Sequence, residues 1–167
     1  ERHFYKHNLK NGKKVKISKE HGTHSVMPSA SGKYFIDVYS STDVARRVDL
    51  MNSNGKYIKC LHESVDPLKE YNIGTIELGT LEAEDGQTLY TRMIKPYNFD
   101  KSKKYPVIIY VYGGPHAQMI TDEWTAGAGI YLHYLSQEGF IVFTLDNRGS
   151  ADRGEAFEQV IHRQCGQ

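Results

Sequence analysis

Apolar and polar residues alternate in short runs over residues 1–61, and this two-residue period is typical of β-strands. Pairs of residues that favour turns separate the runs, at Asn11-Gly12, Ser31-Gly32 and Asn54-Gly55. Asn-Gly between two such runs is a strong hairpin signal, because both residues reach positive φ angles easily. The pattern predicts about five strands, at residues 3–9, 15–18, 34–39, 45–52 and 56–61.

Closely spaced hairpins of this kind predict antiparallel sheet at the start of the chain. They fit one or two four-stranded sheets, or part of a β-propeller, whose blades take about 40–50 residues each. A small β-meander with no wider architecture is the alternative that the pattern leaves open. A polar stretch at residues 62–72, which contains Pro67, then interrupts the strand rhythm. We therefore expect a domain boundary there, with a first domain at residues 1–64 and a second at 65–167.

The pattern beyond this boundary predicts an α/β fold. A hairpin around residues 85–87 is followed by an apolar run at 107–113, a helical pattern at 127–138, a second apolar run at 140–146 and an amphipathic helix at 153–164. Neither apolar run alternates, so we expect both strands to be buried on both faces, as parallel strands are. A right-handed crossover through the first helix would set them parallel.

Composition excludes several functional classes. The chain has 167 residues, 39% hydrophobic and 25% charged, with a formal net charge of +1. Such a balance is ordinary for a soluble globular chain and gives no reason to expect nucleic acid as a partner. No apolar run approaches the roughly 20 residues of a membrane helix, and the first residues lack the apolar core of a signal peptide. Cys60 and Cys165 do not have metal-type spacing and are interpreted as free or structural, and we expect neither metal nor cofactor.

The carboxyl end of the first apolar run carries the candidate chemistry. Tyr112 is followed there by Gly113, Gly114 and Pro115. Sites in open α/β sheets form beyond the carboxyl ends of parallel strands. Two glycines allow a sharp turn and a close backbone approach, and the proline fixes the exit direction. A phenol at this edge could donate a hydrogen bond to a developing oxyanion. The alternative is that Tyr112 is a packed aromatic at the rim and that Gly-Gly-Pro is only a turn.

The second strand end is less specific. Gly149 and Gly154 do not have the spacing of a dinucleotide-binding loop. We expect Arg148 to form a structural ion pair with Asp146 that holds the loop, and a catalytic role for Arg148 is the alternative. The chain has no Gly-x-Ser-x-Gly elbow of the kind a serine hydrolase needs, and His162 is interpreted as a surface or core residue rather than a base.

Three stretches, "KYPVIIYVYGGPHAQ", "LDNRGSADRGEAF" and "VIHRQCG", resemble the catalytic domain of the dipeptidyl peptidase IV family of prolyl-oligopeptidase-like serine peptidases. The second stretch is closer to bacterial members. Related acylaminoacyl peptidases and esterases tend to carry His-Gly-Gly where this chain has Tyr112-Gly113-Gly114. The resemblance implies the end of a β-propeller domain, followed by the N-terminal part of an α/β-hydrolase sheet that stops before the nucleophile elbow.

The resemblance also implies a function. Enzymes of this kind release dipeptides, or in some members tripeptides, from peptide N-termini after Pro or Ala at the second position, through an acyl-enzyme. It makes Tyr112 the side-chain donor of the oxyanion hole. The Ser, Asp and His of the triad are expected outside these residues, so the chain alone is expected to be inactive. A homodimeric parent that is periplasmic, secreted or membrane-anchored is also implied. An acylaminoacyl peptidase or esterase of the same fold, and a non-catalytic propeller module, stay open as alternatives.

Overall fold

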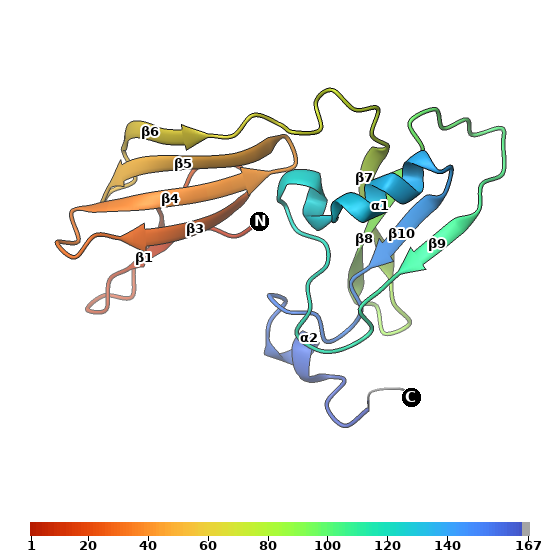
Figure 1. Ribbon diagram of the computed structural model, residues 1–167. Coiled ribbons are helices and arrows are strands. Elements are labelled where there is room, and N and C mark those ends of the chain that lie inside the picture. The colour runs from red at the N-terminus through yellow and green to blue at the C-terminus, as the bar shows by residue number, and fades with distance from the viewer. Residues whose placement is uncertain (165–167) are drawn as a thin grey trace. The chain divides into compact units, whose positions relative to one another are not determined.

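The computed structural model describes residues 1–164, and most of its regular secondary structure is β-strand (Figure 1). The chain divides into two compact units. Unit 1 comprises residues 1–67 together with 121–125, and unit 2 comprises residues 68–120 together with the chain from residue 126 onward. Within the described part of the chain, no helix combines the length and the apolar character that crossing a bilayer requires.

Unit 1 contains a two-stranded and a four-stranded antiparallel sheet. The first pairs β1 (Tyr5–His7) with β2 (Lys14–Lys16). The second has the order β3-β4-β5-β6, with β3 at Thr23–Pro28, β4 at Tyr34–Ser41, β5 at Val44–Asn52 and β6 at Tyr57–Glu63. Each strand therefore pairs with the next one along the chain, as the hairpin signals predicted.

Strand β3 was not among the predicted strands. Its alternation is hard to recognise in the sequence, because the position that it buries is polar: His24 is only 4% exposed. The predicted run at residues 3–9 is also longer than β1, although Asn11-Gly12 does join β1 to β2, with Tyr5 opposite Lys16. The core of unit 1 includes Phe35, whose ring packs against that of Phe4 at a centroid distance of 5.3 Å.

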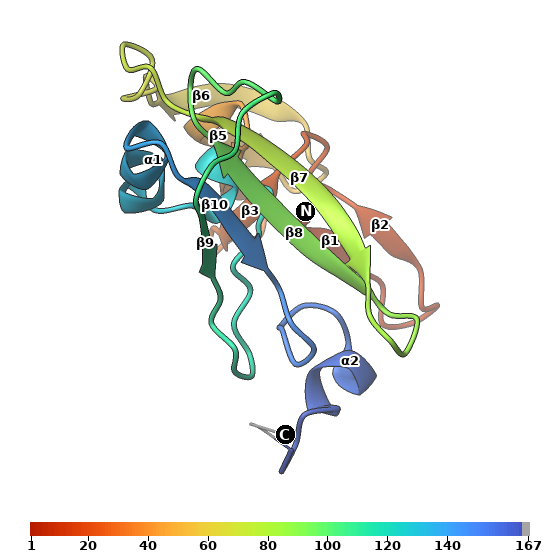
Figure 2. The same ribbon diagram turned by 90° about the vertical axis from the view of Figure 1, so that its right-hand side faces the viewer.

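Unit 2 contains a mixed sheet with the order β7-β8-β10-β9 (Figure 2). Its strands are β7 (Thr75–Glu82), β8 (Thr88–Lys95), β9 (Val107–Tyr110) and β10 (Ile141–Leu145). Strands β9 and β10 are parallel, as predicted, whereas β7, β8 and β10 pair antiparallel. A 3₁₀ turn at Trp124–Gly127 and helix α1 (Ile130–Gln137) connect β9 to β10.

The core of unit 2 lies between α1 and the central strands β8 and β10. It consists of the buried side chains Ile94, Ala128, Leu132 and Val142, with Ile76 and Leu135 packed against them. Gly139 has φ +91°, which lets the chain leave the helix and donate from its N–H to the carbonyl of Ser136. The helix predicted at residues 127–138 is therefore present as α1, and Gly139 follows its C-terminus as predicted.

Strand β9 is not buried on both faces, contrary to the sequence prediction. Val107 and Ile109 are 56% and 69% exposed. Among the described residues β9 pairs only with β10, so it is an edge strand, and α1 packs on β8 and β10 instead. Strand β10 buries Val142 and Thr144 completely, while its alternate residues are half-buried. The lack of alternation in the two apolar runs predicted strands covered on both faces. Among the described residues, α1 covers one face of the sheet, at β8 and β10.

The second predicted helix is much shorter than residues 153–164. Helix α2 spans Glu155–Gln159, and its buried apolar residue is Phe157. Val160 is 41% exposed. A short helix depends on packing of its apolar face, and beyond Gln159 this face is only partly packed: Ile161 lies against Gly149, whereas Val160 is exposed.

Candidate active site

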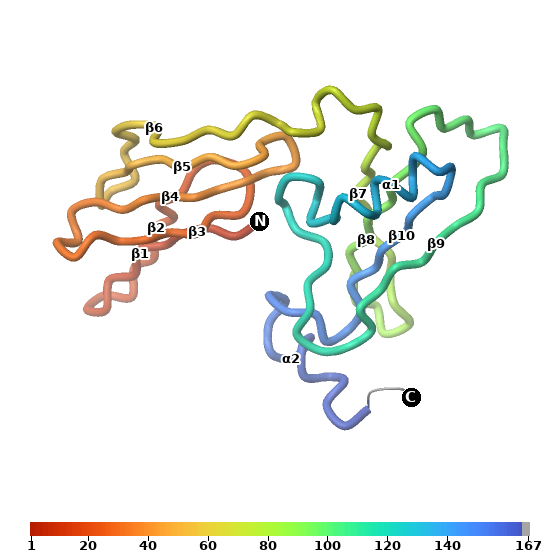
Figure 3. Tube along the Cα trace, viewed as in Figure 1, coloured from red at the N-terminus to blue at the C-terminus, as the bar shows by residue number. Residues whose placement is uncertain are grey.

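The carboxyl ends of β9 and β10 continue into two neighbouring loops, residues 111–120 (the β9 loop) and residues 146–154 (the β10 loop). The two loops run side by side at one end of the sheet (Figures 2 and 3). The N–H of His116 donates to the carbonyl of Gly149 at 2.9 Å, and Nδ2 of Asn147 donates to the carbonyl of Gly114 at 3.4 Å. This is the edge at which parallel strands place functional groups.

Tyr112 lies in the β9 loop just beyond the end of β9 and is 61% exposed. Its ring lies against Gly114, since a Cβ atom at that glycine would be 3.0 Å from Cε1 of the ring. Gly113 has φ +72°, a conformation that favours glycine. The two glycines therefore have different roles: Gly113 turns the chain, and Gly114 leaves room for the phenol. Within residues 1–164 the Tyr112 hydroxyl has no hydrogen-bond partner and is free to donate.

Asp146 begins the β10 loop and holds the far end of the β9 loop. The residue is 3% exposed, and its carboxylate accepts hydrogen bonds from the N–H groups of Met119 at 2.7 Å and Ile120 at 3.1 Å. Burial raises the pKa of Asp146, although the two N–H groups and the nearby Arg92 favour the charged form.

The expected ion pair between Arg148 and Asp146 is wrong. Arg148 forms its ion pair with Asp85, in the turn between β7 and β8, and its guanidinium lies over the ring of Phe157 at 4.9 Å. Asp146 points instead toward the backbone of the β9 loop. The two side chains therefore have different partners although they are only two residues apart in the sequence.

Arg92 on β8 lies beneath both loops and is completely buried. Its Nη1 donates to the carbonyls of Met119 at 2.8 Å and Ala126 at 2.6 Å, and its Nη2 donates to Oγ1 of Thr144 at 3.2 Å. Burial lowers the pKa of Arg92, but a guanidinium stays charged in proteins. His133 on α1 is also buried, and burial together with the charge of Arg92 lowers its pKa, so the ring is neutral.

Arg92 is not among the site residues that the sequence predicts. A signal was present, because Arg92 and Ile94 are two residues apart on β8 and so point to the same face of the sheet. Ile94 is a core residue, which makes an arginine in the same row a candidate for a buried, hydrogen-bonded charge.

The serines that the sequence analysis considered do not form a catalytic pair. Ser136 lies in α1 and donates to the carbonyl of His133, and Ser150 donates to the carbonyl of Asn147. His162 is exposed. Cys60 is a free, half-buried thiol, and Cys165 lies outside the described residues.

A serine, a histidine and a carboxylate also lie close together in unit 1, but they cannot act as a catalytic triad. Nδ1 of His3 lies 3.1 Å from Oγ of Ser18, and its Nε2 lies 2.6 Å from Glu1. Ser18 is completely buried, and its hydroxyl already accepts the N–H of Phe4. No substrate could reach it, so we assign these contacts to the fold.

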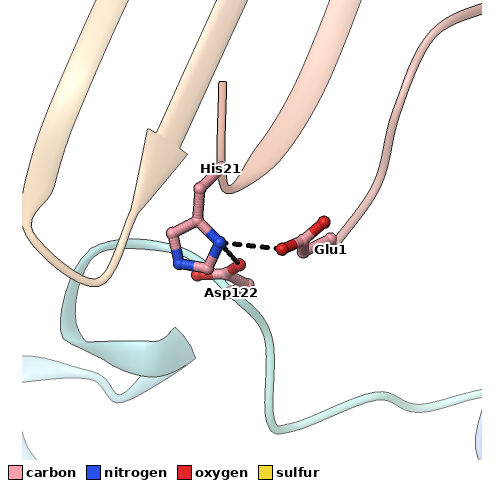
Figure 4. A group of neighbouring side chains, drawn as sticks. All are labelled: Glu1, His21 and Asp122. Carbon is pink, nitrogen blue, oxygen red and sulfur yellow. Dashed lines mark hydrogen bonds and ion pairs between the residues drawn. The ribbon is translucent and has the colours of Figure 1, made fainter. Parts of the chain in front are cut away.

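Glu1, His21 and Asp122 form an ion-pair cluster in unit 1 (Figure 4). Nδ1 of His21 lies 2.8 Å from Glu1 and 3.1 Å from Asp122. Hydrogen bonds from His3 and His21 lower the pKa of Glu1 to about 2, and the same Glu1 bond together with the charge of Asp122 raises the pKa of His21. The ring nitrogen that could bind a metal therefore carries a proton shared between two carboxylates.

Comparison with known proteins connects this fold to peptidases. Residues 129–167 match the Prolyl oligopeptidase family. The chain is 29% identical to mouse dipeptidyl peptidase 8 over 178 residues, which cover 100% of the chain and 20% of that protein. It is 27% identical to dipeptidyl peptidase 4 of Trichophyton equinum over 160 residues, covering 89% of the chain and 20% of that protein.

Two solved bacterial structures are similar as well. A Bacteroides ovatus protein, described as a candidate dipeptidyl aminopeptidase IV, is 43% identical with a TM-score of 0.88 and covers 94% of this chain and 23% of its own. Porphyromonas gingivalis dipeptidyl peptidase 4 is 30% identical with a TM-score of 0.84 and covers 94% of this chain and 22% of its own. The resemblance predicted from the motifs is confirmed. The chain spans about a fifth of the length of the curated relatives that it matches.

Proposed function

We propose, on the premise that this chain is related to the dipeptidyl peptidase IV family, that it forms part of a serine-type dipeptidyl peptidase in which Tyr112 donates a hydrogen bond to the oxyanion. The similarity along nearly the whole chain supports the family, and the position of Tyr112 supports the role. Its hydroxyl is exposed at the carboxyl end of a parallel strand and has no partner within residues 1–164.

The two units fit two parts of such an enzyme. The antiparallel meander β3-β4-β5-β6 has the strand order of a β-propeller blade, and we assign residues 1–64 to the end of a propeller domain. The parallel pair β9 and β10 with its crossover helix fits the N-terminal part of an α/β-hydrolase sheet, and we assign residues 65–167 to that domain.

The proposed chemistry is acyl transfer to a serine. A serine hydroxyl attacks the peptide carbonyl, a histidine takes its proton, and the carbonyl oxygen becomes an oxyanion. The Tyr112 hydroxyl would donate to this oxygen. We place the serine, the histidine and the acid of the triad in the rest of the protein, and the substrates are peptides with Pro or Ala at the second position.

Substitution of Tyr112 by Phe in the full-length enzyme tests this role. Loss of one oxyanion-hole donor typically lowers kcat about 10²–10³-fold. We expect a loss of that order for Tyr112→Phe, with an unchanged thermal unfolding midpoint. Tyr110→Phe is a matched control, because Tyr110 is an exposed tyrosine on β9 itself. Full turnover in Tyr112→Phe would remove the phenol from the mechanism.

The substrate class is tested with two chromogenic anilides. Full-length protein should hydrolyse the Gly-Pro anilide and leave the N-acetyl-Ala anilide intact, because a dipeptidyl peptidase requires a free amino terminus. The opposite preference would indicate an acylaminoacyl peptidase or esterase of the same fold. Hydrolysis of neither, together with a full-length sequence that lacks a Gly-x-Ser-x-Gly elbow, would indicate a non-catalytic propeller protein.

A further inference from the structure

We infer that Asp146, Asn147 and Arg92 are positioning residues for the Tyr112 hydroxyl, because together they fix the backbone of the β9 loop. This inference rests on the proposed role of Tyr112 as an oxyanion donor. None of the three side chains needs to touch the substrate. Their contribution is to hold a loop that has no regular secondary structure between the end of β9 at Tyr110 and Trp124.

The contacts are distributed along the whole β9 loop. Asn147 donates to the carbonyl of Gly114 near the start of the loop. Asp146 accepts the N–H groups of Met119 and Ile120 at its end, and Arg92 donates to the carbonyl of Met119 from the other side. At Met119 the N–H and the carbonyl are thus bound by two opposite buried charges.

The burial of Asp146 and Arg92 makes their hydrogen bonds to the β9 loop important for the position of that loop. Asp146 is 3% exposed and Arg92 is completely buried. Buried charges are tolerated when hydrogen bonds satisfy them, and leaving one without partners is strongly unfavourable. A shift of the loop would remove both backbone partners of Asp146 and one of the two backbone partners of Arg92. These contacts therefore stabilise the observed position of the loop relative to displaced ones.

The link from this position to the phenol passes through Gly114. The Tyr112 ring packs against Gly114, where a Cβ atom would be only 3.0 Å from the ring. The carbonyl of Gly114 accepts the hydrogen bond from Asn147. Movement of Gly114 would move the support of the ring. A displacement of about 1 Å in a positioned group can lower the rate about 100-fold.

A double-mutant cycle in the full-length enzyme tests the inference. In Asp146→Asn the amide can accept one of the two N–H groups but presents a donor to the other. We expect kcat for the Gly-Pro anilide to fall about 10- to 100-fold with little change in KM. In a Tyr112→Phe background we expect Asp146→Asn to cause less than about a twofold further loss, because the hydroxyl that Asp146 positions is already gone.

Two further variants complete the experiment. Glu77→Gln is a matched carboxylate-to-amide control, since Glu77 pairs with Lys95 on the exposed surface of the same sheet, away from the loops, and kcat should not change. Asn147→Ala removes the bond to Gly114 together with the bond from Nδ2 to the carbonyl of Arg148, and it keeps both buried charges, so it serves if Asp146→Asn does not fold. We expect it to lower kcat a few-fold, again without further loss in the Tyr112→Phe background.

The outcomes separate the inference from the proposed function. If Tyr112→Phe itself retains full turnover, the proposed role of Tyr112 fails and the inference fails with it. If Tyr112→Phe loses turnover but the Asp146 and Asn147 losses are the same in both backgrounds, only the inference is overturned, because these residues then act independently of the phenol. Unchanged kcat in both single variants would overturn it as well.

Discussion

At the scale of single residues, the hydrogen-bond partners of His24 show most clearly that a buried side chain is charged. Its Nδ1 lies 2.9 Å from Asp37 and its Nε2 lies 2.9 Å from the carbonyl of Glu20. Both partners accept hydrogen bonds, so both ring nitrogens must carry protons and the ring is an imidazolium. Burial alone would lower the pKa of His24, but the bonds to Asp37 and Glu20 and the charge of Asp37 outweigh burial and raise it.

A raised pKa of His24 makes the stability of unit 1 depend on pH. The folded state binds the proton more tightly than the unfolded state, whose pKa is about 6.5. The stabilisation is therefore fully present below about pH 6.5 and is lost as the pH rises through the folded-state pKa. We expect the urea midpoint of the chain to fall between pH 6 and pH 9. Trp124, the single tryptophan, lies in unit 1 and reports this unfolding by fluorescence.

His24→Gln is the control for this measurement. It removes the titrating ring, and the fall in midpoint should become smaller than in the unchanged chain. His21, whose pKa is also raised, is exposed and stays in both proteins, so its contribution cancels in the difference. Identical pH profiles for the two proteins would show that His24 is not charged in the fold.

At the scale of elements, the turn after β9 determines where the phenol lies. Gly114→Ala would place a Cβ 3.0 Å from the Tyr112 ring. The ring is exposed and can move aside, so we expect only a small change in thermal midpoint, while kcat of the full-length enzyme falls as the hydroxyl leaves its position. Gly86→Ala is a suitable control for a surface glycine in a turn, since a Cβ there meets nothing within 4 Å.

A stable Gly114→Ala variant with normal turnover would contradict the idea that the ring position matters. A variant that loses both stability and turnover would show that Gly114 supports the fold as well. Gly86 has φ +75°, so its alanine variant carries some backbone strain and sets the baseline for stability loss without loss of turnover.

At the scale of the whole molecule, the unpaired edge of β9 is the feature that most favours self-association of the chain. Val107 and Ile109 are exposed on a strand that pairs on one side only within residues 1–164. Exposed apolar strand edges associate with other strands. We expect the 167-residue chain, expressed alone, to self-associate in the micromolar range by sedimentation velocity.

Ile109→Lys should reduce this self-association, because a charge on an edge strand opposes strand pairing. Ile130→Lys, at an exposed isoleucine of similar accessibility that begins α1, should leave it unchanged. A chain that remains monomeric at these concentrations, or equal effects of the two substitutions, would show that the β9 edge does not drive association.

Short stretches of sequence were enough to predict the local elements and the resemblance to dipeptidyl peptidases. Asn-Gly turns and alternating runs fixed the hairpins of unit 1, and Gly139 marked the end of α1, because these signals depend on backbone preferences of a few neighbouring residues. The Tyr112-Gly113-Gly114-Pro115 motif indicated the family for the same reason: it is a short contiguous stretch.

The exposure of β9, the length of α2 and the partners of the buried charges became clear only from the three-dimensional fold. Burial depends on what covers a strand or helix, and periodicity alone does not show which elements provide that cover. Asp146 binds amides 26 and 27 residues away in the chain, and Arg92 binds carbonyls 27 and 34 residues away. These partners meet because β10 pairs with β8 on one side and with β9 on the other, and no local pattern encodes these separations.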